Sequence, residues 1–192
     1  MSQRNPLTFT ICLTGVLSLL IGCSSYRKSH TEDPEAQRAE LKESAQSALA
    51  SFRQKNPKLE SFIDESHGYA VFPSVNKGAI GIGGAHGEGV VYQGGDVIGY
   101  AELSQGTIGV QLGAQTYSEF IFFEDKGALE RFKNSDVKFS GQASAAGGAA
   151  GDAVNADYEE GVAVFTMALG GLMFEASIGG QEFDYQDAEH AP

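Results

Sequence analysis

The sequence contains no tryptophan and only two cysteines, Cys12 and Cys23. Cys12 lies within an apolar N-terminal stretch, so a chain that loses this stretch keeps a single thiol. Disulfide frameworks and zinc sites made of thiolates need two or more cysteines in the folded domain. The cysteine count therefore excludes both for the domain that follows Cys23.

The motifs of nucleotide-binding and hydrolytic enzymes are also absent. The chain has no Gly-Lys-Ser or Gly-Lys-Thr and no Gly-x-Ser-x-Gly. The acidic segment 152–160 lacks the spacing of a calcium loop. The histidines lack the spacing of a zinc site, and they are His30, His67, His86 and His190. We therefore predict a non-enzymatic protein that holds no metal and no other cofactor.

Basic residues are few, with 13 Lys and Arg against 25 Asp and Glu, and the formal net charge is −12. An acidic chain repels DNA, RNA and anionic lipid at long range, so we predict no nucleic acid partner. Many of the basic residues lie within residues 24–66, where a local attraction to an anionic surface remains available.

The N-terminus has the pattern of a secretory signal over residues 1–22. Its apolar stretch, residues 7–21, is short for a membrane-spanning helix. The sequence LIGC that ends at Cys23 resembles a bacterial lipobox, which implies cleavage before Cys23 and lipid attachment to it. Ser24 stands where an Asp would retain such a protein at the inner membrane, so we expect a periplasm-facing, outer-membrane location. The alternative is an uncleaved membrane anchor.

Residues 23–33 are polar and are predicted to form a tether. Asp33 and Pro34 have the character of an N-cap and a first helical residue. Apolar residues then recur at helical spacing, at Leu41, Ala45, Ala48, Leu49 and Phe52. A second short helix is expected within residues 57–66. After Gly68 the pattern changes to short apolar runs separated by glycines, which is typical of β-strands.

The remaining elements complete an α+β prediction. A helix is expected over residues 124–132, and a closing hairpin around Gly170-Gly171. Short strands are expected in segments 69–75, 78–84, 89–93, 96–103, 106–115, 118–123, 137–144, 161–169 and 171–180. Because the helices come first, we expect them to pack on a predominantly antiparallel, glycine-rich β-sheet that forms a sandwich or a barrel. The tail, residues 184–192, is acidic.

The glycine-rich stretch 78–89 raises the question of a phosphate-binding loop. It lacks the Gly-x-Gly-x-x-Gly spacing, and the residues that follow it do not have a helical pattern. Glycines at alternate positions instead strip one face of a strand, so that another backbone or side chain can lie close to it. We therefore interpret the stretch as part of a β-scaffold.

This stretch belongs to a set of motifs that resembles the SYLF domain. The motifs occur in order at residues 66–78, 83–92, 109–115, 122–123, 128–132, 143–147 and 171–177. The resemblance predicts a SYLF domain over residues 34–183. It implies a lipid-binding domain without catalytic activity, since eukaryotic relatives bind phosphoinositide membranes and some bind actin filaments.

Contact with lipid headgroups is predicted for basic side chains, namely Arg38, Lys42, Arg53, Lys55, Lys58 and Lys77. The alternative for the first helix is that its Leu and Phe face packs on the β-sheet. For the whole chain we expect a lipid-binding lipoprotein held at the membrane by Cys23. The alternative is a structural or protein-interaction module with an envelope protein as partner, for which the anchor is the sole membrane contact.

Overall fold

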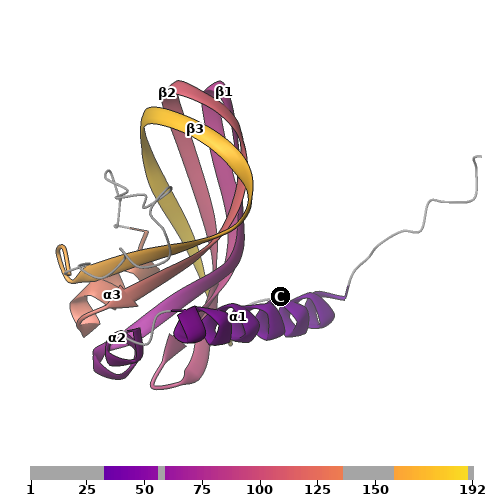
Figure 1. Cartoon of the computed structure of the whole chain (residues 1–192). Helices are drawn as coiled ribbons and strands as arrows, with labels where there is room; N and C mark the ends of the chain where they lie inside the picture. Colours follow the sequence, from indigo (N-terminus) through magenta and orange to yellow (C-terminus); the bar gives the residue numbers. More distant parts are fainter. Residues whose placement is uncertain (1–32, 56–58, 136–157, 190–192) are drawn as a thin grey trace, which may run out of the picture. The chain divides into compact units, whose positions relative to one another are not determined.

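The computed structural model describes residues 33–55, 59–135 and 158–189 (Figure 1). Its elements follow the order α1 (Pro34–Lys55), α2 (Leu59–Glu65), β1 (Gly68–Gln93), β2 (Asp96–Phe123), α3 (Lys126–Lys133) and β3 (Val162–Asp187). The three strands form one antiparallel sheet in the order β1-β2-β3. The α+β class with early helices and an antiparallel sheet is therefore confirmed. The predicted signal, Cys23, and most of the tether lie outside the described residues.

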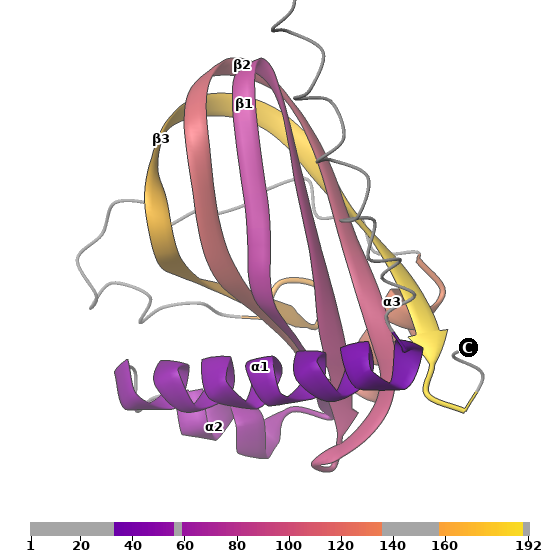
Figure 2. The same ribbon diagram turned by 90° about the vertical axis from the view of Figure 1, so that its right-hand side faces the viewer.

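The first helix begins where the sequence predicted, at Pro34, with Glu35 in its first turn. Its buried residues, Ala45, Leu49 and Phe52, recur at intervals of four and three and form one face. This face packs on the sheet, and α1 lies across the strands with α2 beside it (Figure 2). Among the described helices, none is long and apolar enough to cross a bilayer.

The strands are far longer than the sequence predicted. The segments expected as separate strands merge into β1, β2 and β3, which have 26, 28 and 26 residues. Glycine loses no backbone hydrogen bond in an extended ladder, so the glycines interrupt the apolar pattern without ending the strands. The turn between β1 and β2 is made by Gly94 and Gly95, which both have positive φ, as a two-residue hairpin turn requires.

The predicted closing hairpin at Gly170-Gly171 is wrong. Gly170 pairs with Thr116 and Gly171 pairs with Gln115, so β3 continues through both glycines along the edge of β2. The segments on either side of the glycines both find their partner in β2, and a turn between them would lose these pairs. The predicted strand 137–144 lies outside the described residues, and the predicted helix near residue 124 is confirmed as α3, with Asp125 as its N-cap.

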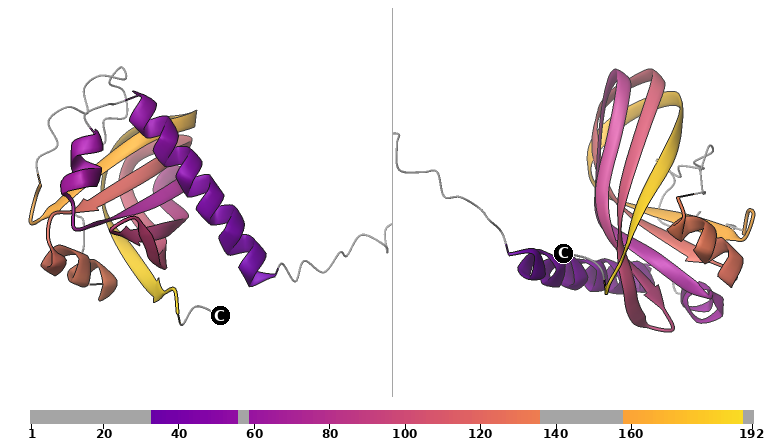
Figure 3. Two further views of the ribbon diagram at one scale, coloured as in Figure 1. Left: turned by 90° about the horizontal axis from the view of Figure 1, so that it is seen from below. Right: turned by 180° about the vertical axis from the view of Figure 1, so that it is seen from behind.

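The sheet bends over on itself, which divides it into two halves. Half A contains residues 68–80, 112–123 and 162–174, and half B contains 82–93, 96–108 and 178–187. The register shifts between Ile80 and Ile82, and Gly81 has a φ of 75° there. Figures 2 and 3 show the strands curving over at the end of the sheet away from α1.

The two halves pack face to face, and the expected sandwich thus forms from a single sheet. Phe72 of half A contacts Phe183 of half B, with ring centroids 5.7 Å apart. Phe132 of α3 extends this inner core at 5.1 Å from Phe183. On the other face of the sheet, Phe52 of α1 stacks on Phe120 at 3.9 Å. The core therefore has two layers, one between the halves and one beneath α1 and α2.

Candidate functional site

Among the side chains that the structure describes, four large aliphatic ones are exposed where the sheet bends. Ile80, Ile82, Ile108 and Leu112 are 83%, 74%, 72% and 64% exposed. Ile80 pairs with Leu112 across β1 and β2, and Ile82 pairs with Ile108, so the four form two neighbouring cross-strand pairs. We call these four residues the apex patch.

The local sequence explains why these side chains point outward. Gly81, with its positive φ and the register shift around it, lies between Ile80 and Ile82 and allows both to be exposed. The surrounding segments, residues 78–87 of β1 and 103–118 of β2, contain no Asp, Glu, Lys or Arg. On β3, Glu175 pairs with Gln111 at this level, so the absence of charge holds for β1 and β2. An exposed apolar surface of this kind is uncommon in a monomeric soluble protein and is typical of a contact with protein or membrane.

The energy available from the apex patch is large enough for binding. Transfer of one exposed Ile or Leu side chain from water to an apolar environment is worth about 1.5–3 kcal/mol. Four such side chains together are worth several kcal/mol even when the transfer is partial, and each 1.4 kcal/mol changes an affinity about tenfold.

The predicted basic residues do not form one surface. Arg38 and Lys42 lie over the ring of Tyr100, 5.2 Å and 5.7 Å from its centroid. Arg53 pairs with Glu60 at 3.1 Å between Nε and Oε2. Since α1 rises about 1.5 Å per residue, its two basic ends are roughly 25 Å apart.

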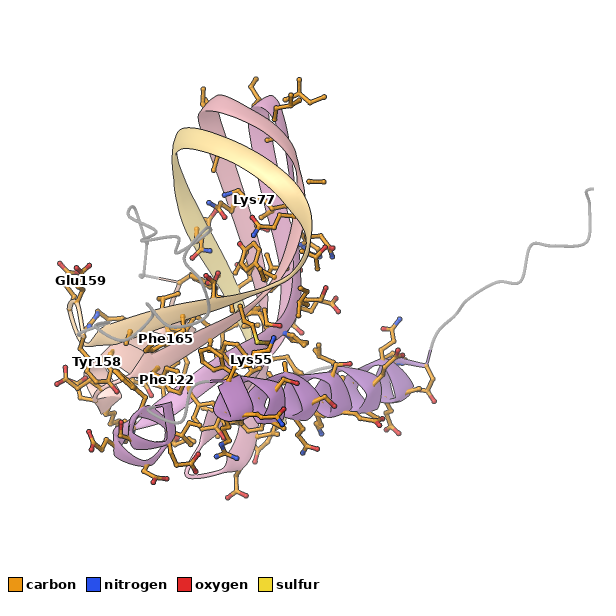
Figure 4. The ribbon with its side chains drawn as sticks, in the orientation of Figure 1. Lys55, Lys77, Phe122, Tyr158, Glu159 and Phe165 are labelled. Carbon is orange, nitrogen blue, oxygen red and sulfur yellow. The ribbon has the colours of Figure 1, made fainter. Side chains whose placement is uncertain are left out.

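The other three predicted residues are lysines, and they differ from one another in position. Lys55 is exposed near the end of α1 (Figure 4), and Lys58 lies outside the described residues. Lys77 is only 6% exposed and lies between the halves of the sheet, away from any headgroup that reaches the surface (Figure 4). Of the predicted contacts, the exposed ones therefore belong to α1, at the opposite end of the sheet from the bend.

A groove of about 260 Å³ lies between the N-terminal half of α1 and the sheet. Three carboxylates line it in register, because Glu88 pairs with Glu102 and Glu102 with Asp184. Like charges in such a row repel each other, and Arg38 on the facing helix offsets part of this repulsion. No group of three metal-ligating side chains occurs among the described residues.

The interior of the bent sheet holds an ionisable side chain. Glu119 is fully buried, and its Oε2 accepts a hydrogen bond from Nε2 of Gln181 at 3.0 Å. Burial raises the pKa of Glu119 from 4.5 to about 7, while the hydrogen bond from Gln181 and the charge of Lys77 oppose the shift. A carboxyl group buried in this way is unusual, and of the predicted site residues Lys77 acts on it.

Sequence reasoning missed both the apex patch and Glu119. The signal for the patch was present, since isoleucines at 80, 82 and 108 stand in long segments without charge. Glycines on either side of these isoleucines favoured an interpretation of the segments as buried strand interiors, in which the isoleucines would not be exposed. For Glu119, the one local signal was its position inside the apolar run SEFIFF, and this signal was weak because a lone acid in a strand is usually exposed.

The chain is similar to known proteins over segments that belong to both halves of the sheet. The model of a family described as "Ysc84: Las17-binding protein actin regulator" matches residues 104–190. A protein from Aeromonas veronii called Beta cell expansion factor A is 25% identical to this chain over 140 residues. The alignment covers 72% of this chain and 53% of that protein, so the chain matches about half the length of this relative.

Proposed function

We propose that this protein, whose residues 104–190 match the SYLF (Ysc84) family, is a non-enzymatic membrane-lipid-binding module that contacts the bilayer through its apex patch. The predicted SYLF resemblance is confirmed over that segment, and the family favours a lipid-binding or actin-regulator type of module. The matched segment contains Ile108 and Leu112, so it includes half of the apex patch.

The observation that carries the proposal is the exposure of the apex patch. An apolar surface that protrudes from the bend of a sheet can enter a bilayer without moving any other element. The four residues of the patch are register partners between β1 and β2, and residues 109–111, which the register shift leaves without a partner on β1, pair with β3 instead. The side chains therefore gain the energy of apolar transfer at little cost in backbone desolvation.

The edges of the sheet limit how deep the apex patch enters. In the described residues β1 and β3 are the outer strands of the sheet, and an edge presents unpaired N–H and C=O groups. Each such group costs several kcal/mol in hydrocarbon. We therefore expect a shallow position at the boundary of headgroups and acyl chains, to a depth of about 5–10 Å.

Electrostatics contributes little to this binding. The chain is acidic, the patch has no charged residue of β1 or β2 around it, and Lys77 is buried. Each basic residue near an anionic surface adds about 1 kcal/mol, and on α1 the acids Glu35, Glu40 and Glu43 offset this gain. The proposed binding is therefore apolar and independent of lipid charge.

The anchor belongs to the same proposal. The lipobox at Cys23 would hold the protein at the membrane, and the location that this pattern favours is the periplasmic side of the outer membrane. A second, weaker membrane contact such as the apex patch would then act at a high effective concentration. The alternative, a protein-interaction module, would use the same apex patch to bind an envelope protein.

The absence of tryptophan provides a direct test. We would replace Ile82 by Trp in a chain that begins at Ser24, so that the new indole is the only one. Neutral vesicles should shift the emission of I82W to the blue, and bromine-labelled acyl chains should quench it. The matched control is L169W, because Leu169 is an exposed aliphatic residue (51%) outside the apex patch. Equal responses of both variants, or no response of I82W, would contradict the proposal.

A further inference from the structure

Polar side chains from both halves of the sheet meet in its interior. Lys77 and Glu119 come from half A, and Gln105, Thr107 and Gln181 come from half B. Four of them are buried, with exposed fractions of 6% or less for Lys77, Thr107, Glu119 and Gln181. The hydrogen bond from Gln181 to Glu119 joins residues 62 positions apart and therefore ties half B to half A.

Three acceptor atoms of this cluster lack a donor. Oε1 of Glu119, Oε1 of Gln105 and Oε1 of Gln181 are all buried without a hydrogen-bond partner among the described residues. A buried acceptor without a donor costs free energy, and an ionised carboxylate costs more than a neutral one. A protonated Glu119 would supply a donor, since a carboxylic acid carries one O–H.

Within the part of the chain that the structure describes, few charged groups act on Glu119. Lys77 of β1 is the charged residue that acts on it, and its attraction favours the ionised form. The described polar side chains of β2 and β3 in this cluster, Gln105, Thr107 and Gln181, carry no charge. The effect of burial on the pKa of Glu119 is larger than the opposing effect of the Lys77 charge, so this pKa rises to about 7.

The backbone beside the cluster has the features of a hinge. Gly81 and Gly113 have φ values of 75° and 136°, and both lie at the bend between the halves. Glycine tolerates such angles and changes them at low cost. The contacts inside the bend therefore decide how firmly the two halves stay together.

We infer that Glu119, Gln181 and Lys77 form a proton-operated latch that holds the two halves of the bent sheet together. Neutral Glu119 closes the latch, because its O–H donates a hydrogen bond to a buried acceptor and the interior then holds no carboxylate charge. Loss of this proton loosens the contact between the halves near the bend. The latch belongs to the fold itself and does not depend on lipid binding.

The test is hydrogen exchange of the full chain, followed by mass spectrometry at about pH 6 and about pH 8 with correction for intrinsic rates. We expect peptides around Gly81 and Gly113 to exchange several-fold faster at the higher pH in the wild type. In E119Q this dependence should disappear, since a glutamine cannot ionise. The control is E182Q, which removes an exposed carboxylate next to Gln181 and should behave as the wild type.

A second variant keeps the inference open to refutation if E119Q does not fold. K77M removes the cation that favours ionised Glu119, so the pH at which exchange increases should move upward. Equal pH dependence at the bend in wild type and E119Q would overturn the latch, and so would an unchanged transition in K77M. Absence of any pH dependence in the wild type would also overturn it.

Discussion

Gly89 tests whether the two halves of the sheet pack against each other. A methyl group at this position would lie 2.6 Å, 2.8 Å and 2.9 Å from Cδ1, Cε1 and Cγ of Phe72. Carbon atoms prefer separations of about 3.5–4.0 Å, so the ring would have to move by about 1 Å. Phe72 is fully buried against Phe183 and has no free space in which to move.

We expect Gly89→Ala to lower the free energy of unfolding by roughly 1–2 kcal/mol. Overpacking costs about 1–3 kcal/mol, and the lower entropy of the unfolded chain returns about 0.4–1 kcal/mol. Urea denaturation monitored by far-ultraviolet circular dichroism would measure the difference. The matched control is Gly78→Ala on the same strand, where the added methyl meets no atom within 4 Å. This control should be neutral or slightly stabilising.

A double-mutant cycle makes the test specific to the contact between the halves. The substitution Phe72→Leu removes part of the ring that the new methyl would meet, so it should relieve the strain of Gly89→Ala. If Gly89→Ala is as stable as Gly78→Ala, the halves do not pack as described, and the reasoning about the bent sheet fails.

Three further predictions concern the same fold. Phe52→Ala should lower the free energy of unfolding, measured by urea denaturation, by about 3–5 kcal/mol, because it removes the ring that α1 stacks on Phe120. A decrease below about 1 kcal/mol would mean that this contact does not hold α1 on the sheet. Asp125→Ala should cost about 1 kcal/mol, because the carboxylate accepts the N–H of Ala128 at 2.8 Å, whereas Asp125→Asn should keep most of that stability. Glu119→Gln should reduce the pH dependence of stability. Folding raises the pKa of Glu119 from 4.5 to about 7, so the free energy of unfolding of the wild type falls by up to about 3 kcal/mol as the pH rises through this range. Denaturation curves at several pH values would check the last, and an equal slope in both proteins would contradict it.

The helices were predictable because their signals are local. Asp33-Pro34 marks the start of α1, the spacing of Ala45, Leu49 and Phe52 marks its buried face, and Asp125 is a recognisable N-cap for α3. Each of these features depends on residues within a few turns of one helix. The structure follows them closely.

The long strands were not predictable from local pattern. Gly170 and Gly171 have the composition of a turn, yet their neighbours on both sides pair with β2. The choice between a turn and a continuous strand is made by these partners, about 55 residues earlier in the chain, and no short window contains them. The alternating glycines could be assigned to a β-scaffold from their spacing, but Phe72, which lies against Gly89, comes from another part of the strand and could not be named.

The candidate site was also predictable only in part. The basic residues of α1 were identifiable by type, but whether they share a surface depends on Tyr100 and Glu60, which the structure places beside them. The apex patch depends on a register shift at Gly81, and the burial of Glu119 depends on the sheet folding over. Both depend on tertiary structure, so the isoleucines in uncharged segments could be noticed in the sequence, but their exposure could not be deduced from it.

The most direct measurement is flotation of the chain from Ser24, which lacks Cys23, with neutral and anionic vesicles over a salt series. The account predicts binding to both kinds of vesicle that persists at high salt, because the apex patch is apolar and its surroundings on β1 and β2 are uncharged. The double substitution Ile80→Ser and Ile108→Ser should abolish it, and Leu169→Ser should not. Absence of binding to any vesicle would contradict the account, and so would binding that requires anionic lipid and disappears with salt.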